Sequence, residues 1–303
     1  MRYKFKEKQK LNIKVENNIL EFESDSFTPK DIFECGQAFN FSKEEDGSYT
    51  FVAFEKIVNV SDESGKIMIK NISEDDFYRY FYDFFDLGVD YKEVKKSLSK
   101  DETLKKACDY GNGIRILNQE IFETIISFII SANNQIPRIK NSVRIISKMY
   151  GKFLGNFNGI DYYSFPDAQT LSKAKVQDLR EYAKVGFRDE RIVETSKMIA
   201  EGFINENDLK LNTENLREKL QKLPGVGPKV ADCILLFSFH RREVYPVDVW
   251  IKRVTETLYI GQEVPKKRIS NFAQNIFGDF SGYVNQYLFY YGRENKIGKK
   301  VEK

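Results

Sequence analysis

The sequence LPGVGPKVADC, residues 223–233, constrains the fold of this 303-residue chain more than any other stretch. Its glycines and prolines interrupt an apolar pattern that has helical spacing on both sides. The sequence therefore predicts a helix over 214–222, a tight turn over 223–228 and a second helix over 229–239. Such a hairpin either connects two packed helices or presents its turn to a partner, and the pattern leaves both interpretations open.

The glycines make this turn a candidate anion site. Gly225 and Gly227 would allow a tight turn, and they would leave the amides at the start of the second helix bare, including that of Val230. Bare amides and the positive end of the helix dipole together attract a negative charge. We therefore expect these three residues to contact a DNA phosphate, with a plain connection between helices as the alternative.

Three residues around the turn are candidates for chemistry. Lys229 stands where the second helix begins, and the positive helix end and partial burial would both favour its neutral, nucleophilic amine. Asp248 stands where an N-cap aspartate belongs, and helix amides would keep it ionised. Beyond capping, Asp248 could stabilise positive charge on a sugar ring if it lies near Lys229. Cys233, one turn after Lys229, is either a small core residue or the floor of a pocket.

Charge and composition narrow the function classes. Residues 1–112 contain 18 Lys and Arg against 23 Asp and Glu, whereas residues 113–303 contain 30 against 22. A basic C-terminal part is typical of a polyanion-binding module, although a solvated lysine-rich surface gives the same balance. Three scattered cysteines argue against a disulfide framework, a zinc ribbon and a cysteine-ligated iron–sulfur cluster. A single histidine nearly excludes His-metal sites and Ser-His-Asp chemistry.

The fold class follows from a change in the spacing of apolar residues along the chain. Short alternating strands are predicted over residues 11–15, 19–22, 49–54, 57–60 and 66–69. From Ser73 the spacing becomes helical, with one helix carrying four phenylalanines and another over 90–109. Everything after residue 113 is expected to be helical. We predict an α+β protein: an N-terminal antiparallel β-sheet domain, residues 1–112, packed on a mainly helical domain, residues 113–303.

One glycine in the N-terminal part stands out. Gly36 interrupts the apolar segment CGQAF at residues 35–39. Such a glycine marks a bulge or a bend, or it lets another group approach the backbone closely.

Two segments of the helical part also contain polar or aromatic side chains that are candidates for binding. The apolar helix expected over 119–132 runs into a polar corner with Asn133 and Arg138, where the amides either cap the helix or have a binding role. A second helix is expected to end at Gly186 as a C-cap and to expose Phe187 and Arg188. In one interpretation Phe187 packs against the protein and Arg188 is a solvated charge. In the other, Phe187 is a wedge and Arg188 a hydrogen-bond donor for nucleic acid.

These stretches together resemble a known family. LPGVGPKVADC followed by YPVDV at 245–249 resembles the helix–hairpin–helix DNA glycosylases, and more narrowly the 8-oxoguanine DNA glycosylase/AP lyase family. The resemblance also covers CGQAF, SFIISANNQIPRI at 127–139 and VGFR at 185–188. It extends over most of the chain, from about residue 11 to 293.

The resemblance implies a role for each matching residue. Lys229 would attack C1′, expel the damaged base and hold the sugar as a Schiff base for β-elimination, while Asp248 would stabilise the charged transition state. The Gly36 carbonyl would accept from N7–H, which 8-oxoguanine has and guanine lacks. Cys233 and Phe289 would sandwich the flipped base.

On the opposite strand, the resemblance implies that Asn133, Arg138 and Arg188 hold the cytosine and that Phe187 inserts into the stack. Two positions depart from the family pattern. The pocket glutamine falls on Asn285, one turn before Phe289, with Gln286 beside it. Trp250 stands where eukaryotic members commonly have a phosphate-binding histidine.

The function implied is excision of 8-oxoguanine from double-stranded DNA with AP lyase action, by a monomer that needs no metal or other cofactor. A glycosylase for another lesion and a DNA-binding module without catalysis are the alternatives. No apolar run reaches membrane-spanning length and the N-terminus lacks a signal-peptide core. We therefore expect no membrane partner and a cytoplasmic location, associated with the nucleoid if the source is bacterial.

Overall fold

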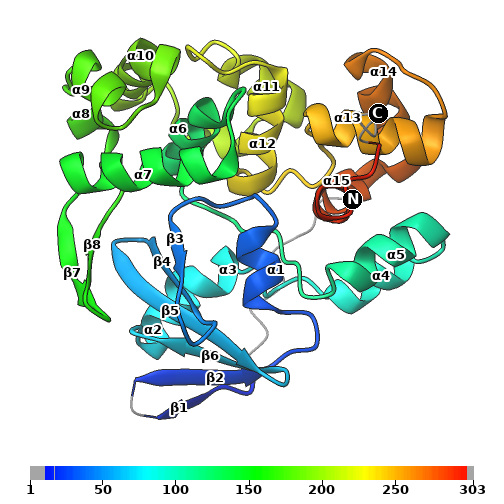
Figure 1. The fold of residues 1–303 in the computed structure, drawn as a ribbon, viewed down its shortest axis with the longest axis horizontal. Coiled ribbons are helices and arrows are strands. Elements are labelled where there is room, and N and C mark those ends of the chain that lie inside the picture. The colour runs from blue at the N-terminus through cyan, green and yellow to red at the C-terminus, as the bar shows by residue number, and fades with distance from the viewer. Residues whose placement is uncertain (1–10, 17, 299–303) are drawn as a thin grey trace, which may run out of the picture.

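The computed structural model describes residues 11–16 and 18–298 and places a six-stranded antiparallel sheet below a body of helices (Figure 1). The strand order is β1-β2-β6-β5-β4-β3. Their bounds are β1 (Lys14–Glu16), β2 (Ile19–Glu23), β3 (Phe41–Lys43), β4 (Tyr49–Ala53), β5 (Lys56–Glu63) and β6 (Lys66–Lys70). The predicted sheet is confirmed. The edge strand β3 was not predicted, because three residues are too few to show alternation.

An aromatic cluster packs against the sheet. It joins the strands to α1 (Pro29–Glu34) and to a helical segment made of α2 (Glu74–Asp76), a π turn (Phe77–Phe81) and α3 (Tyr82–Phe84). Phe51 stacks on Phe84 with ring centroids 5.4 Å apart. Each fully buried phenylalanine stabilises the fold by about 1.5–3 kcal/mol relative to exposure. The cluster therefore fixes the sheet against the segment that leads to the helices.

The single helix predicted over 90–109 is wrong, because two helices occupy this range. They are α4 (Tyr91–Leu98) and α5 (Glu102–Tyr110). Asp101 separates them as an N-cap, since its Oδ1 accepts from the amides of Thr103 and Leu104 at 2.8 and 2.9 Å. Both helices pack into the core of the helical part rather than against the sheet. The division after residue 112 stays a prediction.

The helical part contains the remaining α-helices of the described residues. They are α6 (Ile121–Ser131), α7 (Ile136–Tyr150), α8 (Ala168–Leu171), α9 (Val176–Glu181), α10 (Asp189–Ala200), α11 (Thr213–Leu220), α12 (Pro228–Ser238), α13 (Val249–Thr255), α14 (Lys266–Phe277) and α15 (Ser281–Glu294). α6 is buried along most of its length and packs against α12. No helix within the described ranges is both long and apolar enough to cross a membrane.

The expectation that everything after residue 113 is helical is also wrong. β7 (Phe153–Phe157) and β8 (Ile160–Tyr163) form an antiparallel hairpin that extends beside the sheet (Figure 1). Asn158 and Gly159 connect the strands with φ of +50° and +78°, as expected for an Asn-Gly hairpin turn. The ion pair between Lys152 and Glu55, 2.6 Å long, links the base of this hairpin to the sheet part.

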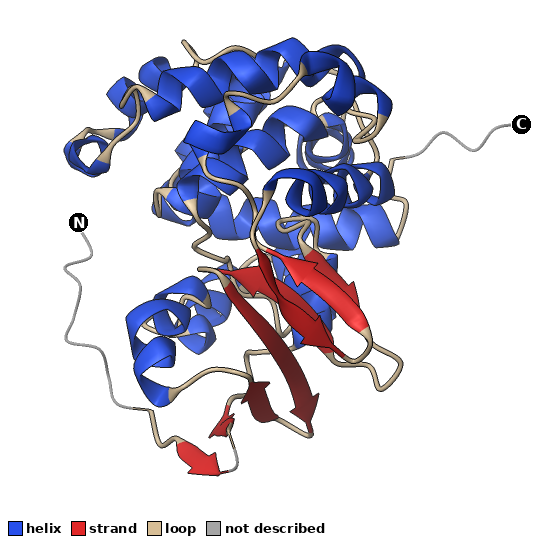
Figure 2. Cartoon of the chain, turned by 90° about the vertical axis from the view of Figure 1, so that its left-hand side faces the viewer, coloured by secondary structure: helices blue, strands red, loops and turns tan. Residues whose placement is uncertain are grey.

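Figure 2 shows the sheet and the body of helices meeting along one side of the sheet part. Buried polar side chains join the two parts there. Gln37 Nε2 donates to the carbonyls of Ile32 and Arg115 at 2.9 and 2.8 Å, and its Oε1 accepts from Leu117 N. Arg242 from the helical part forms an ion pair with Asp86 at 3.3 Å. Since buried polar groups must be paired, these bonds specify one arrangement of the two parts.

Candidate active site

The predicted hairpin is present between α11 and α12. Gly225 requires glycine, because its φ is +87° and a Cβ there would lie 3.1 Å from Ile129 Cγ2. Gly227 has φ −87°, which any residue adopts, so its predicted part in tightening the turn is wrong. A Cβ on Gly227 would meet nothing within 4 Å, and no side chain caps the N-terminus of α12. Pro228, the first residue of α12, has no N–H, and Val230 is buried, so the uncapped helix end offers an anion the backbone around Gly227 and Lys229.

Lys229 lies in the first turn of α12 and is partly buried. Its Nζ donates to Ser131 Oγ at 3.3 Å and lies 5.2 Å from the centroid of the Phe128 ring. Both partners belong to α6. The packing of α12 on α6 thus holds the amine at the C-terminal end of a buried helix, with its stem against apolar surface.

Asp248 caps α13 as predicted: its Oδ1 accepts from Ile251 N at 2.7 Å. Burial raises the pKa of Asp248 above its ordinary value, while the Ile251 amide and the charge of Lys229 oppose this rise. The expected stabilisation of the ionised form by helix amides is present, but burial outweighs it. The influence of Lys229 also shows that the amine and the carboxylate lie close enough to interact electrostatically.

Two further residues predicted for the pocket flank this pair. The Cys233 side chain is buried, and desolvation raises its pKa to about 11 against the opposing charge of Lys229. Asn285 Nδ2 donates to the carbonyl of Pro246 at 3.1 Å. Asn285 therefore ties α15 to the loop that presents Asp248. Trp250 lies in the first turn of α13, with the Arg253 guanidinium 5.1 Å from its ring.

Gly36 lies in the turn that follows α1. Its φ is +83°, so the interpretation as a bend is confirmed. A Cβ on Gly36 would lie 2.8 Å from Cε1 of Phe289, which means that the ring already approaches the backbone closely. The two predicted base-pocket residues, 253 positions apart in the chain, are thus in contact in the fold.

The residues that hold this turn were not predicted to do so. Gln286 Nε2 donates to the Cys35 carbonyl at 2.9 Å, and Arg293 Nη2 donates to the Glu34 carbonyl at 2.5 Å. The contacts of Gln286 and Arg293 connect α15 to the end of α1, and the two helices lie side by side in Figure 1. No local pattern signals these two contacts, because their partners lie more than 250 residues away. Gln37, described above, bonds to the other side of the turn.

The polar corner and the predicted wedge lie next to each other. Asn133 is exposed and has φ +52°, and Arg138 is exposed in the first turn of α7. The amide that caps the end of α6 is that of Asn134, whose Nδ2 donates to the Ile130 carbonyl at 3.1 Å. Phe187 is 57% exposed, as predicted.

The expected exposure of Arg188 is wrong. α9 ends at Glu181, Gly186 begins a short 3-10 turn, and the Arg188 side chain is buried. Its guanidinium donates to the carbonyls of Ala132, Asn133 and Val185. Carbonyls at the C-terminal end of a helix lack partners and attract a cation, so the end of α6 binds Arg188 in this structure.

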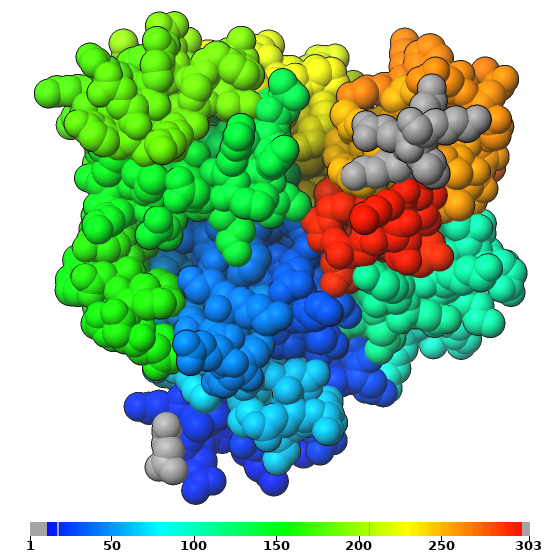
Figure 3. Space-filling view, viewed as in Figure 1, coloured from blue at the N-terminus to red at the C-terminus, as the bar shows by residue number. Residues whose placement is uncertain are grey.

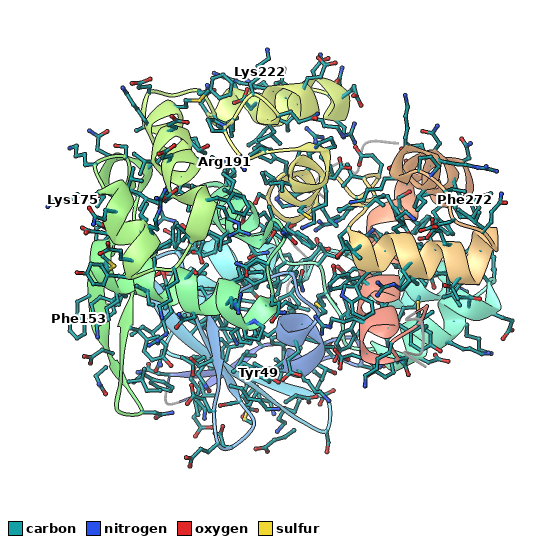
Figure 4. All side chains as sticks on the ribbon, turned by 45° about the horizontal axis from the view of Figure 1, so that its top comes forward. Tyr49, Phe153, Lys175, Arg191, Lys222 and Phe272 are labelled. Atoms are coloured by element: carbon teal, nitrogen blue, oxygen red, sulfur yellow. The ribbon has the colours of Figure 1, made fainter. Side chains whose placement is uncertain are left out.

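A hollow of about 610 Å³ separates the hairpin turn from α10. Phe187 and Arg191 line one side, and Gly225 and Gly227 line the other. Arg191, labelled in Figure 4, lies against the turn, since a Cβ on Gly225 would be 3.3 Å from its Cδ. Figure 3 also shows a recess between the green and the orange helices, with yellow residues deeper between them, which is a separate feature because residues after Gly227 do not line the hollow. The hairpin and the exposed Phe187 thus border the same open face.

Comparison with known proteins agrees with this geometry. Residues 19–125 match the family model of the 8-oxoguanine DNA glycosylase N-terminal domain, and residues 126–277 match that of the HhH-GPD superfamily of base excision DNA repair proteins. A probable N-glycosylase/DNA lyase of Methanothermobacter thermautotrophicus is 33% identical over 236 residues, 70% of this chain and 74% of the relative. An N-glycosylase/DNA lyase of Saccharomyces cerevisiae is 34% identical over 201 residues, 62% and 53% of the two chains.

A solved structure supports the same assignment. The 8-oxoguanine glycosylase/lyase of Clostridium acetobutylicum, in complex with double-stranded DNA containing cytosine opposite 8-oxoguanine, superposes with a TM-score of 0.91. It is 42% identical, and the match covers 94% of this chain and 98% of the relative. The chain therefore belongs to the 8-oxoguanine DNA glycosylase/lyase family of helix–hairpin–helix base excision repair proteins.

Proposed function

We propose that this chain excises 8-oxoguanine from duplex DNA with Lys229 as the nucleophile and then cleaves the strand at the resulting site. The observation that carries the proposal is the placement of Lys229 and Asp248, which begin two different helices and interact electrostatically. The uncapped N-terminus of α12 beside them offers a place for a DNA phosphate.

The chemistry follows from these positions. The lone pair of Lys229 Nζ forms a bond to C1′ while the C1′–N9 bond breaks, and its electron pair leaves with the base. Positive charge develops on the sugar, and the ionised Asp248 stabilises it in a partly buried site where water screens little. The amine and the opened sugar then form a Schiff base, which favours loss of a C2′ proton and departure of the 3′ phosphate.

Base choice and strand contacts complete the proposal. The Gly36 carbonyl accepts from N7–H of the lesion, and Cys233 and Phe289 enclose the flipped base. Asn133 and Arg138 are exposed and available to the opposite cytosine, whereas Arg188 must first leave the carbonyls of α6. Phe187 fills the space that the flipped base leaves in the stack of DNA bases. The protein acts as a monomer on DNA.

Trapping with borohydride tests the nucleophile. A duplex with one 8-oxoguanine should give a covalent adduct with the wild-type protein and none with Lys229→Gln, whereas DNA binding persists. Lys222→Gln is the matched control, because Lys222 is an exposed lysine seven residues earlier (Figure 4). An undiminished adduct with Lys229→Gln, or none with the wild type, contradicts the mechanism.

A further inference from the structure

Arg293 lies at the edge of the proposed base pocket, and the family resemblance assigned it no role. It follows Phe289 by one turn of α15, and its guanidinium carbon lies 5.5 Å from the centroid of the Phe289 ring. The side chain is only 17% exposed. Arg293 is therefore a mostly buried cation on the same helix face as the predicted stacking residue.

Two of the three guanidinium nitrogens have protein partners. Nε donates to a carboxylate oxygen of Glu294 at 2.8 Å, and Nη2 donates to the Glu34 carbonyl. The third, Nη1, is buried, and no atom of the described residues accepts a hydrogen bond from it. A buried donor without an acceptor is costly, more so on a charged group. Arg293 thus has an unused donor at a defined place.

That place is the Gly36 turn. A Cβ built on Gly36 would lie 3.2 Å from Arg293 Nη1 and 2.8 Å from Phe289 Cε1. The unused donor, the stacking ring and the backbone of Gly36 therefore meet at one point.

We propose that Arg293 is a base-reading residue whose Nη1 donates to a carbonyl oxygen of the flipped base. The inference rests on the proposed excision of 8-oxoguanine. N7–H of that base lies between two carbonyl oxygens, O6 and O8, so a donor beside the Gly36 carbonyl faces one of them. As the C1′–N9 bond breaks, its electron pair moves onto the base and the carbonyl oxygens share the negative charge. The bond from Arg293 therefore strengthens toward the transition state.

Base analogues separate this role from a structural one. Single-turnover excision by the wild type and by Arg293→Met is compared on duplexes that contain 8-oxoguanine, 2-amino-8-oxopurine, which lacks O6, or 8-aminoguanine, which lacks both O8 and N7–H. Because the missing N7–H slows the wild type as well, the loss on each base is taken as the rate of the variant relative to that of the wild type on the same base. We expect a loss of about 10- to 100-fold on 8-oxoguanine. The loss should vanish on the analogue that lacks the oxygen which Arg293 contacts, and the analogue concerned identifies O6 or O8.

An equal loss on all three bases would mean that Arg293 acts only by binding the Glu34 carbonyl. No loss on 8-oxoguanine would mean that Arg293 has no part in excision. Either result overturns the inference. Strand cleavage at a preformed abasic site has no base to read and should be unchanged, which reports that the variant is folded. If Arg293→Met does not fold, Arg293→Lys, which keeps the positive charge, replaces it in the same assays. Arg79→Met is the matched control on an exposed arginine of the sheet part. A wild-type protein without excision would instead refute the proposed function.

Discussion

The hairpin and the Gly36 pocket are built in opposite ways. The hairpin is local: α11, the turn and α12 are consecutive, and Gly225 and Lys229 lie four residues apart. The pocket joins a turn after α1 to a helix at the other end of the chain, with Gln286 bonded to Cys35 across 251 positions. In the proposed function this difference corresponds to two tasks: the hairpin would bind any DNA strand, and the Gly36 pocket would select one base.

The contrast between the hairpin and the Gly36 pocket can be tested by comparing two activities of each variant. Changes in the hairpin and around Lys229 should affect every substrate, whereas changes in the pocket should affect excision of 8-oxoguanine and spare strand cleavage at a preformed abasic site. Five substitutions examine this division.

The largest effect is expected for Asp248→Asn. Excision should fall by about 10²–10³-fold, the usual loss when a charge-stabilising group is removed, while asparagine still caps α13. Burial raises the folded pKa of Asp248 above the unfolded value, so the ionised carboxylate opposes folding once the pH exceeds the unfolded pKa. At neutral pH the melting temperature of Asp248→Asn should therefore equal or exceed that of the wild type. A less stable variant with full activity would refute this account.

Gly36→Ala should reduce excision of 8-oxoguanine by about 10- to 100-fold, the scale of a misplaced group in a reacting site. The added methyl would meet the Phe289 ring, and a φ of +83° strains alanine. Cleavage of an abasic duplex by the same variant is the control. If both activities fall together, the pocket and the hairpin are not separate.

The two hairpin glycines provide a matched pair. Both Gly225→Ala and Gly227→Ala should weaken binding to 8-oxoguanine and abasic duplexes alike, by about tenfold or 1.4 kcal/mol. Gly225→Ala should also lower the free energy of unfolding by about 1–2 kcal/mol because of its positive φ, whereas Gly227→Ala should not. Fluorescence anisotropy and chemical denaturation measure the two quantities. Unchanged DNA affinity in Gly227→Ala would show that the open helix end does not face DNA.

The smallest effect is expected for Phe187→Ala. The side chain is exposed, so stability should change by less than about 0.5 kcal/mol. Excision from duplex DNA should fall by about 3- to 10-fold, because less of the cost of base flipping is recovered. Tyr182→Ala removes an equally exposed aromatic residue nearby and should leave excision intact. Equal losses from both variants would deny Phe187 a specific role.

The same contrast explains what the sequence could reveal. Gly225, Lys229 and the Asp248 cap depend on neighbours a few residues away, so their positions and the helices around them could be predicted. The β7–β8 hairpin could also have been predicted, since Asn158-Gly159 is a strong local turn signal.

Long-range contacts were out of reach. The burial of Arg188 depends on a carbonyl 56 residues earlier, at the end of α6. The Gly36 turn depends on Gln286 and Arg293, for which neither spacing nor hydrophobic period gives a signal. The roles of Gly36, Cys233 and Phe289 toward a base could be proposed only through family resemblance, and the side chains that hold the Gly36 turn are seen only in the fold.

The buried thiols have a consequence for survival under oxidative stress. Desolvation raises the pKa to about 12 for Cys35 and Cys108 and to about 11 for Cys233. Peroxides attack the thiolate, and at neutral pH these cysteines form almost none. We expect the three cysteines to remain reduced when the protein is exposed to hydrogen peroxide, which titration of free thiols after unfolding would measure.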